Sequence, residues 1–157
     1  MLVNLTPLAK YTAPDPTTAE MAEEVNLSED EFIFLSSVVE AESDRSTATT
    51  PEALEGRIMI AATIINRINS SYFPDSVEAV LEQSGQFSTV RNGHSITDRS
   101  EYSDQAVILA FQYLEEGRIP TNVLFFNCLG YNYGTPYGNY GGNYFMQYGE
   151  EVPYNAN

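Results

Sequence analysis

The sequence predicts an α+β domain that is built mainly from helices. Two long segments repeat apolar residues at helical spacing after clear capping residues, and one short apolar run is typical of a buried strand. A tyrosine- and glycine-rich segment near the C-terminus has glycines spaced like turns. At 157 residues, of which 43% are hydrophobic, the chain fits one compact domain with a real core.

The first long helix is predicted to begin after Ser28, because Ser28 and Glu31 form the pattern of a capping box. The apolar residues that follow share one helical face: Phe32, Leu35 and Val39. Glu42 continues this stripe near the expected helix end, where apolar surroundings would raise the pKa of its carboxyl. Such an acid suits glycoside cleavage, although the pattern alone favours an ordinary paired or solvent-facing glutamate.

Capping and stop residues define the other elements. A second helix is predicted from Pro51, with Thr50 as its cap, to about Asn69. The remaining expected elements are a short helix over 76–83 with Asp75 as cap, a helix over 101–116 that Gly117 ends, and a buried strand over 122–127. Residues 130–148 hold six tyrosines and five glycines, and we expect an ordered, turn-rich wall there rather than disorder.

Two regions are expected: an N-terminal arm or linker over residues 1–26, and the catalytic domain over 27–157. Three prolines interrupt the first region, although residues 18–25 could form a short helix. The first ten residues lack the basic and apolar regions of a secretory signal, and no 18-residue apolar run is present, so we expect neither a leader nor membrane insertion.

Charge and composition exclude several kinds of partner and site. The net charge of −15 argues against binding to nucleic acid or to anionic membranes. A single cysteine excludes an internal disulfide, and a single histidine leaves too few ligands for zinc, while carboxylate-only metal sites remain open. No phosphate loop or dinucleotide fingerprint is present, and we expect no cofactor.

Nucleophilic catalysis has little support in the sequence. A serine triad needs a histidine, and His94 lies in an apparent exposed turn without a nucleophile-elbow motif. Cys128 follows a buried-looking strand, where an isolated cysteine is expected to be an inert core residue. The remaining possibility is acid catalysis by a carboxyl group.

Several short motifs occur in a fixed order between residues 31 and 146. They are Ala41-Glu42, Glu55-Gly56 through Asn66-Arg67, Phe73-Pro74-Asp75-Ser76, Gln83 with Gly85 to Val90, Phe126-Asn127, and GGNYF at Gly141–Phe145. In this order and spacing the chain resembles the spore-cortex-lytic (SleB-like) cell wall hydrolases. The resemblance implies a lysozyme-like, mostly helical fold that cleaves peptidoglycan glycan strands, with the cell wall or spore cortex as partner.

The resemblance also implies roles for particular residues. Glu42 matches the family's catalytic glutamate and would act as the acid and base of a lytic transglycosylase, which needs a single carboxylate for both steps. Residues expected to contact the substrate are Ser43, Gln86, Phe87, Ser88, Phe126, Asn127 and Asn143. Asn66 and Arg67 are assigned instead to a buried structural network.

Three departures from the family pattern and three other interpretations remain. Asn143 stands where the family often has histidine, Phe126 where it usually has tyrosine before the matching asparagine, and Cys128 where it usually has proline after that asparagine. A hydrolytic muramidase would need a second carboxylate, for which Asp44, Glu52 and Glu55 are candidates. A catalytically weak carbohydrate-binding protein or a virion structural protein would use the same cleft, and a phage origin would fit a compact domain without a signal.

Overall fold

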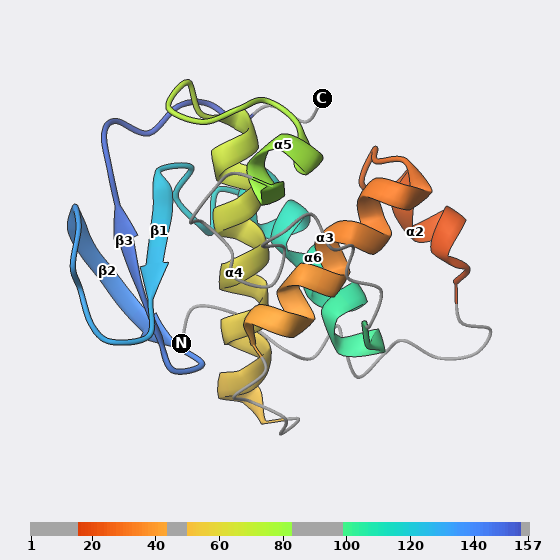
Figure 1. Cartoon of the computed structure of the whole chain (residues 1–157), viewed down its shortest axis with the longest axis horizontal. Helices are drawn as coiled ribbons and strands as arrows, with labels where there is room; N and C mark the ends of the chain where they lie inside the picture. The colour runs from red at the N-terminus through yellow and green to blue at the C-terminus, as the bar shows by residue number, and fades with distance from the viewer. Residues whose placement is uncertain (1–15, 44–49, 83–98, 155–157) are drawn as a thin grey trace.

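The computed structural model describes residues 16–43, 50–82 and 99–154, and all structural statements below concern these residues (Figure 1). They form an α+β fold that is mainly helical, with a small three-stranded sheet. The helices are α2 (Thr18–Glu24), α3 (Glu29–Glu42), α4 (Pro51–Asn69), α5 (Val77–Glu82) and α6 (Glu101–Glu115). The strands are β1 (Val123–Asn127), β2 (Thr135–Tyr140) and β3 (Asn143–Gln147). The predicted fold class is thereby confirmed at the level of α+β.

Helix α4 is the central element of the fold. In Figure 1 the sheet lies on one side of α4, and α2, α3 and α6 lie on the other. Helix α4 contacts α3, α5 and α6 as well as β1 and β2. Every residue of α4 from Ala53 to Arg67 is buried, and apolar residues are found all round this part of the helix.

Local capping explains where most helices begin and end. Ser28 caps α3 with a complete capping box to Glu31, and Thr50 caps α4 ahead of Pro51, both as predicted. Gly117 follows α6 with φ of 74°, a left-handed conformation that favours glycine. The cap of α5 differs from the prediction, because the hydroxyl of Ser76, not Asp75, accepts a hydrogen bond from the N–H of Ala79.

The segment before residue 27 departs from the expected arm where the structure describes it. Thr17 caps α2 with a capping box, and α2 packs against α3 and α6. Met21, Ala22 and Val25 are buried in the same core as α3 and α4. Residues 16–26 are therefore packed on the domain, because the short helix that the sequence allowed there carries one apolar face.

The sheet has the strand order β1-β3-β2 and is antiparallel throughout. The expected strand at 122–127 is confirmed as β1, and the tyrosine- and glycine-rich segment is ordered, with two strands in place of a series of turns. Strand β3 is central because it pairs with both β1 and β2, and its Phe145 is buried in the core that the helices share. The largest fully buried side chains come mostly from α3, α4 and α6: Phe32, Leu35, Ile58, Met59, Ile60, Ile64 and Leu114.

The β2–β3 turn is joined to α4 by direct contact between two backbones. A Cβ atom placed on Gly56 would lie 2.8 Å from the Cα of Gly141, and Gly141 itself has φ of 60°. No side chain fits between the turn and the helix at this point, which explains why the Glu55-Gly56 motif has a glycine. Among the described helices, none combines the length and apolar character that a membrane span needs.

Candidate active site at the C-terminal end of α3

Glu42 is the last residue of α3, and its side chain is half-buried. Ser43 is the C-cap of the helix, and its hydroxyl donates hydrogen bonds to the carbonyls of Val39 and Glu40. Ser43 is buried and its hydroxyl proton is thus used within the helix end. The apolar stripe that precedes Glu42 lies in the core, as predicted, which fixes the position of the carboxyl-bearing turn.

Arg67 of α4 supplies a positive charge to this carboxylate. Its Nε donates a 2.7 Å hydrogen bond to the carbonyl of Leu124 in β1, and its guanidinium lies over the rings of Phe73 and Phe125, 4.8 Å and 5.4 Å from their centroids. Burial lowers the pKa of Arg67 to about 10, and the negative charge of Glu42 opposes that shift. The guanidinium is therefore charged near neutral pH and interacts electrostatically with Glu42.

The surroundings of Glu42 include a charged group that its sequence pattern did not predict. The interaction between the positively charged guanidinium and the Glu42 carboxylate is attractive. Arg67 was expected only in a buried network, and its hydrogen bond to β1 confirms that part. Asn66 belongs to the same network, since its amide donates to the carbonyls of Pro120 and Val123 at 2.9 Å and 3.1 Å.

A second charged group fixes the end of α3 to its neighbours. Glu40 accepts from Arg57 of α4 at 3.3 Å and from the hydroxyl of Ser100, the cap of α6, at 2.6 Å. Sequence analysis did not single out Glu40, and its position one helical turn after Ser36 on an otherwise buried face was the available signal. This network holds three helices together two residues before Glu42.

The candidate second carboxylates are placed differently. Glu52 is exposed, whereas Glu55 is buried beside the sheet. Burial raises the pKa of Tyr140 in β2, and the negative charge of Glu55 raises this pKa further. Glu55 and Tyr140 therefore lie close enough to interact electrostatically. Asp44 lies outside the described residues. Of the two that are described, Glu55 is the carboxylate held inside the fold.

Three predicted substrate-contacting residues meet at one end of the sheet. Phe126 and Asn127 in β1 pair with Phe145 and Tyr144 in β3, and the buried Asn143 begins that strand. The Asn127 side chain accepts a 2.6 Å hydrogen bond from the N–H of Leu129, which fixes its carbonyl oxygen in the turn after β1. Contacts of these residues with substrate stay predictions. Gln86, Phe87, Ser88 and His94 lie outside the described residues.

Two further expectations can be compared with the structure. Cys128 is exposed and not the core residue that was expected, because β1 ends at Asn127 and the chain turns outward. Within the described ranges, no group of three or more histidine, cysteine, aspartate or glutamate side chains could hold a metal ion.

Comparison with known proteins places the chain in a family. The model of the cell wall hydrolase family matches residues 51–137, which are more than half of the chain. The chain belongs to this family. The resemblance to SleB-like cell wall hydrolases that the motifs indicated is thereby confirmed. Phe126 and Asn127 lie inside the matched residues of this cell wall hydrolase, and Glu42 precedes them.

Two relatives are spore cortex-lytic enzymes. The protein from Oceanobacillus iheyensis is 35% identical over 57 residues, which are 36% of this chain and 21% of that enzyme. The protein from Bacillus subtilis is 39% identical over 57 residues, 36% of this chain and 19% of that enzyme. The matched part thus spans about a fifth of each relative's length. No solved structure matches the chain, so its likeness to lysozymes stays a prediction.

Proposed function

We propose that this cell wall hydrolase cleaves the glycan strands of peptidoglycan between N-acetylmuramic acid and N-acetylglucosamine. Membership of the family carries the substrate class, and the relatives named as spore cortex-lytic enzymes support it. The acidic, cofactor-free set of candidate groups suits acid–base cleavage of a glycosidic bond.

In the proposed mechanism Glu42 serves in turn as acid and as base. Protonated Glu42 gives its proton to the glycosidic oxygen as the C1–O bond breaks, and the resulting carboxylate then takes the proton of the muramic C6 hydroxyl as that oxygen attacks C1. The products are a free 4-hydroxyl on the leaving sugar and a 1,6-anhydro-muramic end, with no water consumed. The positive charge of Arg67 interacts electrostatically with the negative charge that forms on Glu42 when it gives up its proton.

Hydrolysis of the same bond is the second candidate, favoured by the burial of Glu55. A muramidase needs a second carboxylate, either as nucleophile or to activate water. Glu55 is the described candidate that the fold holds inside, next to Tyr140. The two reactions differ in their product, since hydrolysis leaves a reducing end and transglycosylation leaves an anhydro end.

Mass spectrometry of the released fragments tests the proposal. Purified vegetative peptidoglycan and spore cortex are incubated with the wild type, with Glu42→Gln, and with Glu24→Gln as a matched control on the exposed surface of α2. We expect anhydro-muropeptides from the wild type and from Glu24→Gln, and a loss of at least about 100-fold in rate for Glu42→Gln, the scale that an acid–base residue contributes.

Each other outcome has a definite meaning. If the wild type forms products with reducing ends and Glu55→Gln does not, the protein is a muramidase and not a transglycosylase. Undiminished turnover by folded Glu42→Gln would remove Glu42 from the catalytic role. Binding without products from any protein would favour a carbohydrate-binding or virion structural protein.

A further inference from the structure

An aromatic cluster that the proposed reaction does not use is built on the outer end of the sheet. Tyr133 stacks on Tyr148 with ring centroids 5.3 Å apart, and Tyr148 meets Tyr72 edge to face at 5.1 Å. Phe125 lies behind them, 4.8 Å from Tyr133 and 5.9 Å from Tyr148. We call Tyr72, Tyr133 and Tyr148 the tyrosine platform. Tyr72 and Tyr133 remain 59% and 50% exposed although their rings are in contact with neighbours.

Separate segments of the chain contribute the platform residues and pack against them. Tyr72 follows α4 and packs over the bare backbone of Gly149, where an added Cβ would lie 3.0 Å from the Tyr72 hydroxyl. The N–H of Tyr133 donates to the Sδ of Met146 in β3 at 3.3 Å, and a hydrogen bond with Tyr148 raises the pKa of the Tyr133 phenol. The exposed rings are therefore fixed before any ligand arrives, which lowers the entropic cost of binding.

Arg67 connects the platform to the candidate active site. Its guanidinium lies over Phe125, which contacts two platform rings, and over Phe73, whose ring centroid is 5.9 Å from that of Phe125. The same guanidinium interacts electrostatically with Glu42. The Arg67 side chain therefore contacts Phe125, a neighbour of two platform rings, and also interacts with Glu42.

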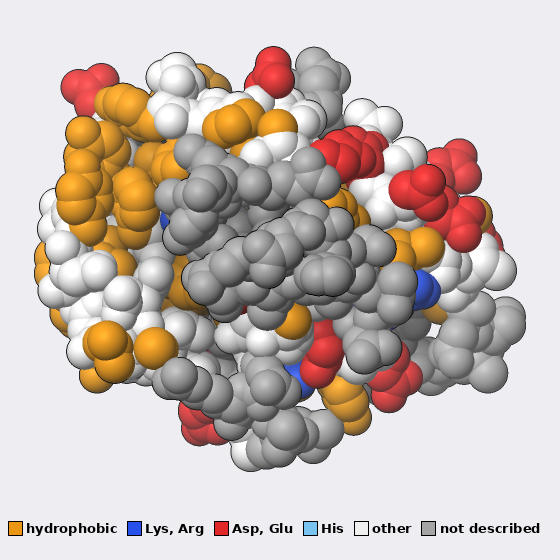
Figure 2. All heavy atoms as spheres, viewed as in Figure 1, with side chains coloured by type: hydrophobic (Ala, Val, Ile, Leu, Met, Phe, Trp, Pro, Cys, Tyr) orange, Lys and Arg blue, Asp and Glu red, His pale blue; other side chains and the backbone are white. Residues whose placement is uncertain are grey.

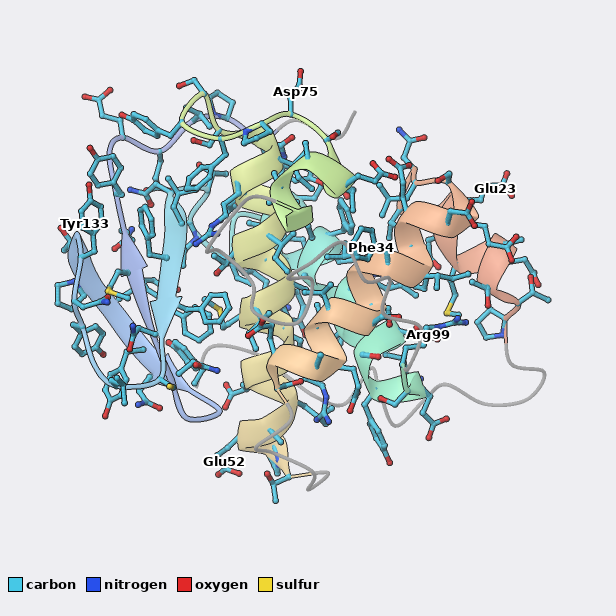
Figure 3. All side chains as sticks on the ribbon, viewed as in Figure 1. Glu23, Phe34, Glu52, Asp75, Arg99 and Tyr133 are labelled. Carbon is cyan, nitrogen blue, oxygen red and sulfur yellow. The ribbon has the colours of Figure 1, made fainter. Side chains whose placement is uncertain are left out.

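Most of the platform is carried by a stretch of chain without charged side chains. Residues 121–149 contain no aspartate, glutamate, lysine or arginine, and Glu150 and Glu151 follow directly. Figure 2 shows hydrophobic side chains, tyrosines included, gathered over the sheet, and acidic side chains gathered on the opposite side over α2 and α3. In Figure 3 Tyr133 lies at the outer edge of the sheet, far from Glu23 and Phe34. A neutral ligand meets little repulsion here, whereas the helical side repels anions.

We propose that the tyrosine platform binds a sugar ring of the same peptidoglycan strand, at a subsite away from the bond that Glu42 cleaves. Pyranose rings present flat C–H faces that pack on aromatic faces, and phenol hydroxyls can hydrogen-bond the acetamido groups. Rigid tyrosines supply this contact at low entropic cost. The inference rests on the proposed function for the identity of the strand, and it predicts that long strands bind better than short ones.

Binding and turnover are measured separately to test the platform. In a Glu42→Gln background, which prevents turnover, Tyr72→Ala and Tyr133→Ala are compared for binding to purified peptidoglycan sacculi and to soluble N-acetylglucosamine oligomers of increasing length. Tyr131→Ala is the matched control, because Tyr131 is 44% exposed in the same β1–β2 connection but pairs with Tyr144, not with the platform. Tyr133→Phe keeps the ring and removes the hydroxyl.

We expect each alanine variant to bind sacculi about 2- to 10-fold more weakly, the range that one aromatic contact supplies. Tyr133→Phe should bind nearly as well as the parent, and the loss should grow with oligomer length. In the catalytically intact background the same changes should raise KM for long strands and leave kcat within about 2-fold.

Three results would overturn the platform. Unchanged binding by folded Tyr72→Ala and Tyr133→Ala would contradict sugar binding by the platform, and the proposed cleavage by Glu42 would be unaffected. An equal loss in Tyr131→Ala would show a general effect of aromatic surface. Concentration-dependent dimerisation of the parent, abolished in Tyr133→Ala, would make this surface a contact between copies. Failure of the proposed function is seen instead as absent products in the fragment analysis.

Discussion

The helices on one side of α4 and the sheet on its other side are stabilised by different contacts. The helical side combines fully buried aliphatic residues with charged and hydroxyl groups, such as Glu40 with Arg57 and Ser100. The sheet side relies on ring contacts and carries no charge from residue 121 to 149. Under the proposed function the two sides have different roles: the helical side positions the acid, and the sheet side carries the tyrosines that we propose to bind a sugar ring.

The largest effect is expected on the helical side, for Glu40→Ala. This change removes a charged partner of Arg57, whose side chain is only 4% exposed, while Glu40 itself is 28% exposed. Because the loss of a charged partner is costly for a buried cation but the pair is partly solvated, we expect a loss of about 2–4 kcal/mol in the free energy of unfolding. Urea denaturation followed by circular dichroism measures it.

An exposed ion pair provides the control for this change. Glu116 lies 3.4 Å from Arg118 with both side chains largely in solvent, so Glu116→Ala should cost less than about 1 kcal/mol. Similar losses of stability in Glu40→Ala and Glu116→Ala would mean that the buried charged network contributes no more to stability than an exposed ion pair.

A smaller effect is expected where the two sides meet, for Gly56→Ala. The new Cβ would lie 2.8 Å from the backbone of Gly141, so the turn must move away from α4. We expect a net loss of about 1–2 kcal/mol after the gain in helix propensity is subtracted. Denaturation of Gly56→Ala, Gly141→Ala and the double variant tests the contact. Since both changes fill the same gap, the double variant should lose less than the sum, and strict additivity would contradict a shared contact.

The smallest effect concerns the tyrosines near the sheet in alkaline solution. Burial raises the pKa of Tyr137, Tyr140 and Tyr154, with smaller contributions from nearby negative charges. The folded state thus holds these protons more tightly than the unfolded chain. Their stabilising contribution is complete below the unfolded pKa of about 10 and is lost as pH rises through the higher folded values.

Ultraviolet titration of tyrosinate absorbance measures this difference. We expect part of the native absorbance to appear above pH 10 and to move to about pH 10 in urea. Tyr140→Phe should remove part of the late absorbance. If the folded protein and the protein in urea titrated identically, the raised pKa of these tyrosines in the folded state would be contradicted.

Helix boundaries could be predicted from sequence because caps are local. Ser28 with Glu31, and Thr50 with Pro51, each act within one turn of the helix that they begin. The choice between Asp75 and Ser76 depends on the geometry of a single N–H, which composition does not fix. The packing of α2 escaped prediction because a helix of seven residues is marginal alone and is stabilised here by Met21 and Ala22 in the shared core.

The site was less accessible to sequence reasoning than the helices. Glu42 could be singled out because it extends an apolar stripe, and Arg67 because it is a polar residue in an apolar helix. Their electrostatic interaction depends on how α3 and α4 pack, and spacing along the chain contains no information on that. The tyrosine platform likewise joins residues from three places in the chain, so only the tyrosine-rich composition of residues 130–148 could be recognised in the sequence.

The strand order β1-β3-β2 has a consequence for synthesis of the chain. The two outer strands pair only with β3, which is the last of the three to be made. When the chain has been synthesised up to residue 137, every described helix has been made, but β1 and the first residues of β2 still lack the strand with which they pair. Residues 143–147 must emerge before β1 and β2 can be joined, so the surface that carries the tyrosines is assembled last.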